Sequence, residues 1–185
     1  DHPYNYHMDE WHQLQSINNL ILKGSPNIEG SANGTIFHFL LSGAYLSPLV
    51  LLKIIDASQI TNGVSSLLMQ KRLFEILRLN TLIFGCLSLF IFSSLVKKFF
   101  KINPTLPLTL FAVTPLWLSL SNYFKYDIAL VFWIITSLFS LLKYGQKTTL
   151  INYIIAGVFC SLALATKVSA LPLLLIYILS FFYFN

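Results

Sequence analysis

The chain has 185 residues, of which 56% are hydrophobic and only 10% are charged, and its mean hydropathy is +0.70. Soluble domains usually carry about 25% charged residues, so this composition excludes an ordinary soluble fold and predicts an integral membrane protein. The net charge is +5, but the basic residues are scattered or stand at the ends of apolar runs. That pattern is typical of membrane anchoring and excludes a nucleic-acid-binding face.

Neither the two ends of the chain nor its two cysteines indicate a catalytic site. The sequence begins at Asp1 without a methionine or a signal peptide and ends directly after an apolar run. We therefore expect a fragment with sequence missing at both ends, including at least one span before Asp1. Cys86 and Cys160 lie within apolar runs and are interpreted as small packing residues without a disulfide.

The first part of the chain is polar, and its pattern of apolar residues predicts helices that lie along the membrane surface. Between Asp9 and Lys23 the apolar positions recur at spacings of three and four, which predicts an amphipathic helix that rests in the interface. Ile36–Ile55 is apolar but broken by Ser, Gly and Pro. These breaks favour a juxtamembrane or re-entrant helix over a full span. A further helix is predicted over Ser65–Leu77.

Five apolar segments follow, each close to the minimum of about 17 residues that a transmembrane helix needs. They are Leu79–Val96, Leu106–Phe124, Asp127–Leu142, Leu150–Thr166 and Val168–Phe184. Prolines lie within or near their ends, which membrane helices tolerate when neighbouring groups satisfy the freed carbonyl. The sequence therefore predicts an all-α, polytopic membrane bundle. Residues 1–78 would form a first outer loop with juxtamembrane helices, and residues 79–185 about five spans.

Charge in the short loops predicts how these spans are oriented. Five lysines without an acid follow the first and third spans, namely Lys97, Lys98, Lys101, Lys143 and Lys147. Such clusters are typical of cytoplasmic loops, so the alternate loops should face outward. Those loops carry Arg78, Lys125, Asp127 and Lys167. Asp9 faces the same side only if Ile36–Ile55 does not cross the membrane.

At this point the order of the motifs resembles a known family. Asp9-Glu10 opening an interfacial helix, a second apolar helix after a Gly turn, and Arg78 at the start of a span are similar to the GT-C superfamily of polytopic glycosyltransferases. The resemblance is to the branch of the protein O-mannosyltransferases and the bacterial aminoarabinose transferases. An acid at the start of a span, in Lys125-Tyr126-Asp127, and the pair Thr166-Lys167 also fit this branch.

The resemblance implies transfer of a sugar from a dolichyl- or undecaprenyl-phosphate donor to an acceptor hydroxyl, with inversion. The acceptor would be a protein, a lipid or a glycan. The enzyme would lie in the plasma membrane of a prokaryote or in the endoplasmic reticulum, with its site facing the periplasm, the exterior or the lumen.

Three acids are the candidate catalytic residues. Asp9 is expected to be the general base, because a carboxylate in a partly dry site can have a pKa raised into the range that suits proton transfer. Glu10 has either a functional role or only that of an acid favoured by the helix dipole. Asp127 is expected to orient the acceptor, position a basic side chain or share a metal, and it could also cap its helix. An acid beside hydrocarbon is costly and usually marks function.

Cations are expected to bind the anionic leaving group. Arg78 and Lys167 are the first candidates, with His7, His12 and Lys125 as further substrate- or phosphate-binding residues. The alternative for the three long basic side chains is ordinary anchoring at the membrane interface.

A metal site is not predicted, and no cofactor is certain. His2, His7, Asp9 and His12 form a loose cluster of plausible ligands, but their spacing matches no compact zinc motif. If a divalent ion is used, Asp9 and Asp127 would hold it.

Two other functions compete with sugar transfer. In a transporter or flippase for a lipid-linked or small polar substrate, Asp127 and Lys167 would be polar groups along the path. Inverted repeats would support that reading, and none is evident. The third alternative is a non-catalytic membrane scaffold.

Overall fold

The computed structural model describes Glu10 and residues 67–184. The predictions for the interfacial helix between Asp9 and Lys23 and for Ile36–Ile55 lie outside the described residues. The same is true of three candidate site residues, namely Asp9, His7 and His12. The described residues form helices and no strands, in agreement with the predicted all-α class.

The first described helix, α4, is longer than the sequence predicted. It runs without interruption over Leu67–Leu95 and continues as a π-helix, η1, over Val96–Phe100. The sequence predicted a separate helix ending at Leu77, and this is wrong because no proline or turn sequence breaks the chain there. Lys101, with φ of 55°, ends η1 in the left-handed conformation, a common way for a helical segment to stop.

The second predicted span is broken into two short helices. These are α5, Thr105–Ala112, and α6, Pro115–Ser121. Pro115 is the first residue of α6, and Thr114 before it has ψ of 124°. Proline disfavours the helical conformation for the residue that precedes it, which accounts for the break. A proline expected to be tolerated inside one helix therefore starts a new one.

The last three predicted segments are helical. Helix α7 covers Tyr126–Gln146 and α8 covers Leu150–Thr166, with the bounds that the sequence predicted. Thr149 caps α8, its side chain accepting a hydrogen bond from the Asn152 backbone N–H at 3.4 Å. The final segment begins as a 3₁₀ turn, η2, over Val168–Ala170 and continues as α9, Leu171–Phe184.

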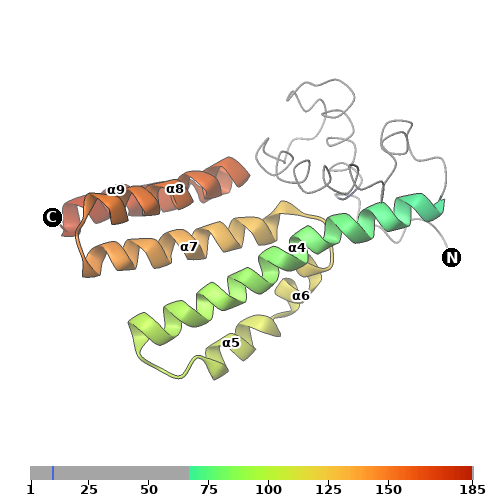
Figure 1. The fold of residues 1–185 in the computed structure, drawn as a ribbon, viewed down its shortest axis with the longest axis horizontal. Helices are drawn as coiled ribbons and strands as arrows, with labels where there is room; N and C mark the ends of the chain where they lie inside the picture. The colour runs from blue at the N-terminus through green and yellow to red at the C-terminus, as the bar shows by residue number, and fades with distance from the viewer. Residues whose placement is uncertain (1–9, 11–66, 185) are drawn as a thin grey trace, which may run out of the picture.

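Helix α7 lies between α4 and α8 in the bundle (Figure 1). One buried cluster joins α4, α6 and α7 and consists of Phe84, Trp117, Ile128 and Ala129. A second joins α7, α8 and the start of α9 and consists of Leu130, Cys160, Ala163, Ala170 and Leu173. Small residues in the second cluster let these helices approach closely.

The two cysteines differ in their surroundings. Cys160 is buried, so its prediction as a packing residue is confirmed. Cys86 is exposed on α4, so the same prediction is wrong for that residue, because it lies on the side of the helix that faces away from the bundle.

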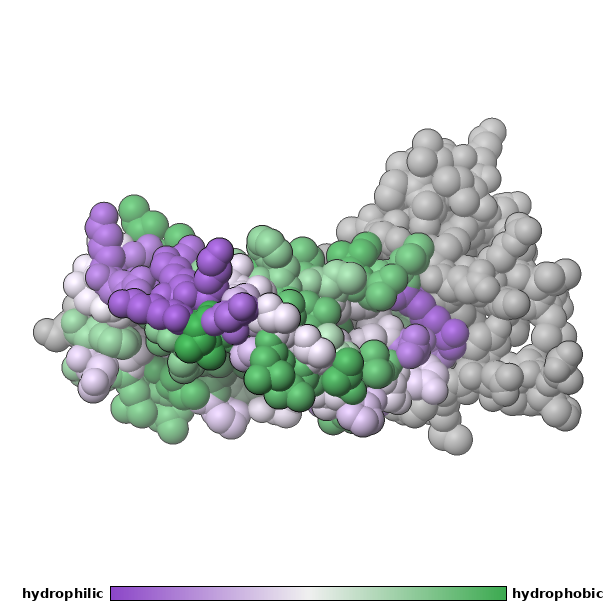
Figure 2. Space-filling model, turned by 90° about the horizontal axis from the view of Figure 1, so that it is seen from below, coloured by the Kyte–Doolittle hydropathy of each residue, from purple (hydrophilic) through white to green (hydrophobic). Residues whose placement is uncertain are grey.

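Two of the described helices are long and apolar enough to cross a membrane, namely Arg78–Phe100 and Tyr126–Gln146. The segments Leu150–Thr166 and Val168–Phe184 are apolar but shorter. Large hydrophobic side chains stay exposed along the bundle, for example Phe90 at 68% and Leu150 at 73%. Figure 2 shows that hydrophobic surface separates hydrophilic groups at the two ends of the face it draws. This surface supports the predicted membrane location.

Candidate functional site

The charged residues predicted to face outward lie at one end of the bundle. The helices alternate in direction, so the point where α4 enters the bundle, the α6–α7 corner and the α8–α9 corner meet there (Figure 1). Arg78 comes from α4, Lys125 and Asp127 from the start of α7, and Lys167 from the residue between α8 and η2. We refer to these four residues with Glu10 as the polar end.

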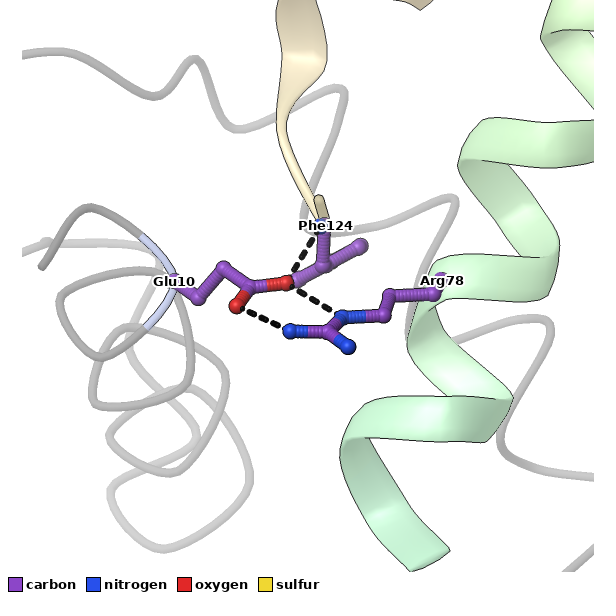
Figure 3. A network of polar contacts seen from close by, with 3 residues as sticks. All are labelled: Glu10, Arg78 and Phe124. Carbon is purple, nitrogen blue, oxygen red and sulfur yellow. Dashed lines mark hydrogen bonds and ion pairs between the residues drawn. The ribbon is translucent and has the colours of Figure 1, made fainter. Parts of the chain in front are cut away.

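Of the two carboxylates of the polar end, that of Glu10 accepts the larger number of hydrogen bonds (Figure 3). Arg78 donates two parallel hydrogen bonds to it, from Nε to Oε1 at 2.8 Å and from Nη2 to Oε2 at 2.7 Å. The backbone N–H of Phe124 donates a third, to Oε1 at 2.7 Å. The Glu10 side chain is fully buried, whereas that of Arg78 is 30% exposed. Both carboxylate oxygens are therefore occupied by partners within the protein.

These three bonds connect parts of the chain that are far apart in sequence. Glu10 and Arg78 are separated by 68 positions, and Glu10 and Phe124 by 114. The bidentate geometry is the strong form of an arginine–carboxylate pair. Removing one member of a buried pair leaves an uncompensated charge. Glu10 thus acts as a clamp, because it joins α4, through Arg78, to the α6–α7 corner, through Phe124. This role goes beyond the helix-dipole role considered for Glu10.

Asp127 is placed differently, between two lysines. Lys167 Nζ donates to Asp127 Oδ1 at 2.9 Å, and Lys125 Nζ lies 3.6 Å from Oδ2. Asp127 lies in the first turn of α7, where the helix dipole favours a negative charge. The N-cap position of that helix is held by Lys125, so Asp127 does not take the capping role that was considered as an alternative for it.

Lys167 is the most accessible cation of this ion-paired group. Its side chain is 36% exposed, against 20% for Lys125 and 18% for Asp127. Its ammonium lies 5.1 Å from the centroid of the Tyr126 ring, within the range of a cation–π contact. One carboxylate and one ring thus fix the position of Lys167 while part of its surface faces outward. An ammonium has three donors, so it can bind an anion while still bonded to Asp127.

Two polar residues that sequence reasoning missed lie just inside the polar end. Asn80 and Thr81 follow Arg78 on α4 and are 5% and 2% exposed. Within the part of the chain that the structure describes, the Asn80 Nδ2 and Thr81 Oγ1 atoms have no hydrogen-bond partner, which is uncommon for buried polar groups. In the sequence, the feature that could have indicated these two residues was an asparagine, Asn80, inside an apolar run. Thr166, by contrast, is satisfied by its own helix, donating to the Leu162 carbonyl at 2.8 Å.

The described residues do not form a metal-binding group. Within Glu10 and residues 67–184, no three His, Cys, Asp or Glu side chains cluster as ligands. Asp127 is flanked by two ammonium groups, which would repel a cation beside it. The predicted alternative of a divalent ion shared with Asp9 involves a residue outside the described part of the chain.

The five residues of the polar end carry three positive and two negative formal charges, so the group has an excess of positive charge.

Comparisons with protein-family models, with curated proteins and with solved structures found no match to this chain. The function is therefore inferred from the sequence pattern and the geometry of this site.

Proposed function

We propose that this protein is a polytopic membrane glycosyltransferase of the GT-C type, which transfers a sugar from a polyprenyl-phosphate donor to an acceptor hydroxyl with inversion. The observation that carries the proposal is the contact of Glu10 with Arg78 and with the backbone of Phe124. It brings Glu10, the second residue of the Asp-Glu pair, to the end of the bundle that holds Asp127 and Lys167. That is the order of groups expected from the sequence resemblance.

The reaction needs stabilisation of an anionic leaving group, and Lys167 is suited to supply it. Breaking the bond between the sugar and the phosphate leaves negative charge on a polyprenyl phosphate. A positioned ammonium at a partly dry site stabilises such charge more than water does. Asp127 then acts by holding the Lys167 ammonium in place, the second of the three roles considered for it. Arg78 is bonded to Glu10 and so contributes to phosphate binding from a fixed position.

Asp9 is proposed as the base that takes the proton of the acceptor hydroxyl. It precedes Glu10 in the sequence. Glu10 itself is poorly suited to that step, because its oxygens already accept three hydrogen bonds. Within the Asp-Glu pair, Asp9 would therefore take the proton, and Glu10 would anchor the contact with Arg78 and Phe124.

The membrane arrangement is part of the proposal. Helices α4, α7, α8 and α9 would each cross once, and α5 with α6 would cross as a broken pair, which gives five spans. The alternating helix directions support this arrangement. So does the location of the acid-free lysine loops at the end opposite Asp127. The site would face the exterior, the periplasm or the lumen.

The test uses the purified full-length protein, a defined dolichyl- or undecaprenyl-phosphate sugar and a panel of hydroxyl acceptors. We expect release of polyprenyl phosphate together with a glycosylated product. Asp9→Asn should abolish this turnover while thermal unfolding stays unchanged. Retained turnover in that variant would mean that another group is the base.

A transport function would give a different result. In that case, vesicles containing the protein would move a lipid-linked or polar substrate across the bilayer without breaking the sugar–phosphate bond. Absence of turnover with every donor, together with such movement, would refute the transferase proposal.

A further inference from the structure

The end of the bundle opposite the polar end has a charged cluster of its own. Five lysines lie exposed there, namely Lys97, Lys98, Lys101, Lys143 and Lys147. The sequence has no acidic residue between Glu75 and Asp127, and none after Asp127. Figure 2 shows a hydrophilic surface at this end (left), separated by hydrophobic surface from that at the other end. The cluster therefore has no nearby acid in the sequence to neutralise it.

Two of these lysines converge on a single aromatic ring. Lys98 Nζ, from η1, lies 5.9 Å from the centroid of the Phe139 ring. Lys143 Nζ, from the last turn of α7, lies 4.7 Å from the same centroid. Phe99 packs edge-on against Phe139 at 5.6 Å and 84°. We call Lys98, Lys143 and Phe139 the lysine pair site.

The π-helical turn helps to form this site. Lys98 lies in η1, Val96–Phe100, and π-helical turns are rare, short and frequent at functional sites. The wider turn changes the direction of its side chains relative to α4. Lys98 also lies 5.5 Å from the ring of its neighbour Phe99. The Phe139 ring thus lies within cation–π distance of one ammonium from η1 and of one from α7.

Two ammonium groups held near one ring repel each other, and their attraction to the ring offsets this only in part. An anion bonded to both lysines would turn this repulsion into two charge-assisted hydrogen bonds. A phosphodiester has oxygens suited to that geometry. The residues beside the lysines are apolar and exposed, with Phe100 at 63% and Leu142 at 38%. Acyl chains can lie along such a surface, which favours a lipid over a soluble anion.

We propose that Lys98 and Lys143, placed by Phe139, bind the phosphodiester headgroup of an anionic phospholipid in the cytoplasmic leaflet. This inference rests on the membrane orientation proposed above but not on the transferase reaction. The lipid would bind at the acid-free end of the bundle, against Lys98 of η1 and against Phe139 and Lys143 of α7.

The experiment measures lipid selectivity of the full-length protein in nanodiscs that contain phosphatidylcholine and phosphatidylglycerol. Lipids that remain bound after extraction are counted by native mass spectrometry. We expect phosphatidylglycerol to be retained in preference to phosphatidylcholine. The double variant Lys98→Gln with Lys143→Gln should lose roughly tenfold or more of this preference. Phe139→Leu should lose part of it.

The matched control is Lys97→Gln with Lys147→Gln, which removes the same charge from the same end. General attraction of lysines to an anionic surface would make the two double variants equal, and that result would overturn the proposal. Displacement of the retained lipid by inorganic phosphate would overturn it too, because the site would then take a soluble anion. Sugar transfer is measured separately, so failure here is distinguishable from failure of the transferase proposal.

Discussion

At the scale of single residues, the two described carboxylates of the polar end have different surroundings. Glu10 is fully buried and its two oxygens accept three hydrogen bonds. Asp127 is partly exposed and lies between two ammonium groups. A buried, fully bonded carboxylate stabilises a fold, whereas a partly exposed one can hold a cation beside a substrate. We therefore assign anchoring to Glu10 and positioning of Lys167 to Asp127.

The anchoring role predicts a strong energetic coupling between Glu10 and Arg78. Each single change removes the main partner of the other charge, and Arg78 is partly exposed to solvent. Glu10→Gln and Arg78→Gln should therefore each reduce the free energy of unfolding by about 2 kcal/mol, less than for a fully buried pair. The double variant should lose clearly less than the two single losses together. Unfolding in detergent, followed by circular dichroism, measures all four proteins. Additive losses would show that the contact does not stabilise the fold.

The proposed catalytic role of Lys167 predicts a difference between two neighbouring lysines. Lys167→Gln should lower kcat for sugar transfer about 100-fold, since the loss of one donor to a developing anion has an effect of that order. Lys125→Gln should have a much smaller effect, because its ammonium lies farther from Asp127 and is less exposed. Steady-state kinetics of the full-length protein give both values. Equal losses would contradict the assignment, and Lys167→Arg should restore part of the rate.

At the scale of the helices, close packing of α8 against α9 depends on a glycine. A Cβ added at Gly157 would lie 2.7 Å from the Tyr177 Oη atom and 3.0 Å from its Cζ. The Tyr177 ring is held by stacking on Tyr153, with ring centroids 4.4 Å apart. The two hydroxyls also donate to each other's backbone carbonyl at 3.4 Å. The ring therefore has little room to move away.

This contact predicts that Gly157→Ala destabilises the protein by about 1–3 kcal/mol, as overpacking in a tight interface does. Thermal unfolding in detergent is the measurement. Gly85→Ala is the matched control, because its Cβ would meet nothing nearer than 3.7 Å. Alanine is also the better helix former by roughly 1 kcal/mol, so that variant should be neutral or stabilised. Addition of Tyr177→Phe to Gly157→Ala should recover part of the loss.

The helices also show how far local sequence predicts local structure. The bounds of α8 follow from Thr149 as its cap and from a uniform apolar run. Leu106–Phe124 is equally apolar, yet it breaks at Thr114 because Pro115 restricts the residue before it. Hydropathy predicted that both segments are helical. Whether a proline interrupts a helix or is tolerated within it depends on neighbouring groups, which a hydropathy pattern does not contain.

At the scale of the whole molecule, the proposed orientation can be tested by labelling from one side. In full-length protein lacking Cys86 and Cys160, Asn122→Cys should react with an impermeant thiol reagent added outside. Gln146→Cys should react only after the membrane is opened. Both residues are exposed at opposite ends of the bundle. A cysteine in place of His7 should behave like the one at position 122, and labelling from the opposite side would rule out a site shared by Asp9 and Asp127.

The sequence by itself determined the helical class and four of the five apolar segments as uninterrupted runs. It also determined the separation of the acid-free lysine cluster from Arg78, Asp127 and Lys167 along the chain. These features depend on composition and on neighbours a few positions apart. Only the tertiary structure decided which charges pair. It joined Glu10 to Arg78 and to Phe124, and Asp127 to Lys167, across 68, 114 and 40 positions. Such partners are chosen by which helix ends meet in the bundle, and this is why the clamp role of Glu10 was not evident from its place in an Asp-Glu pair.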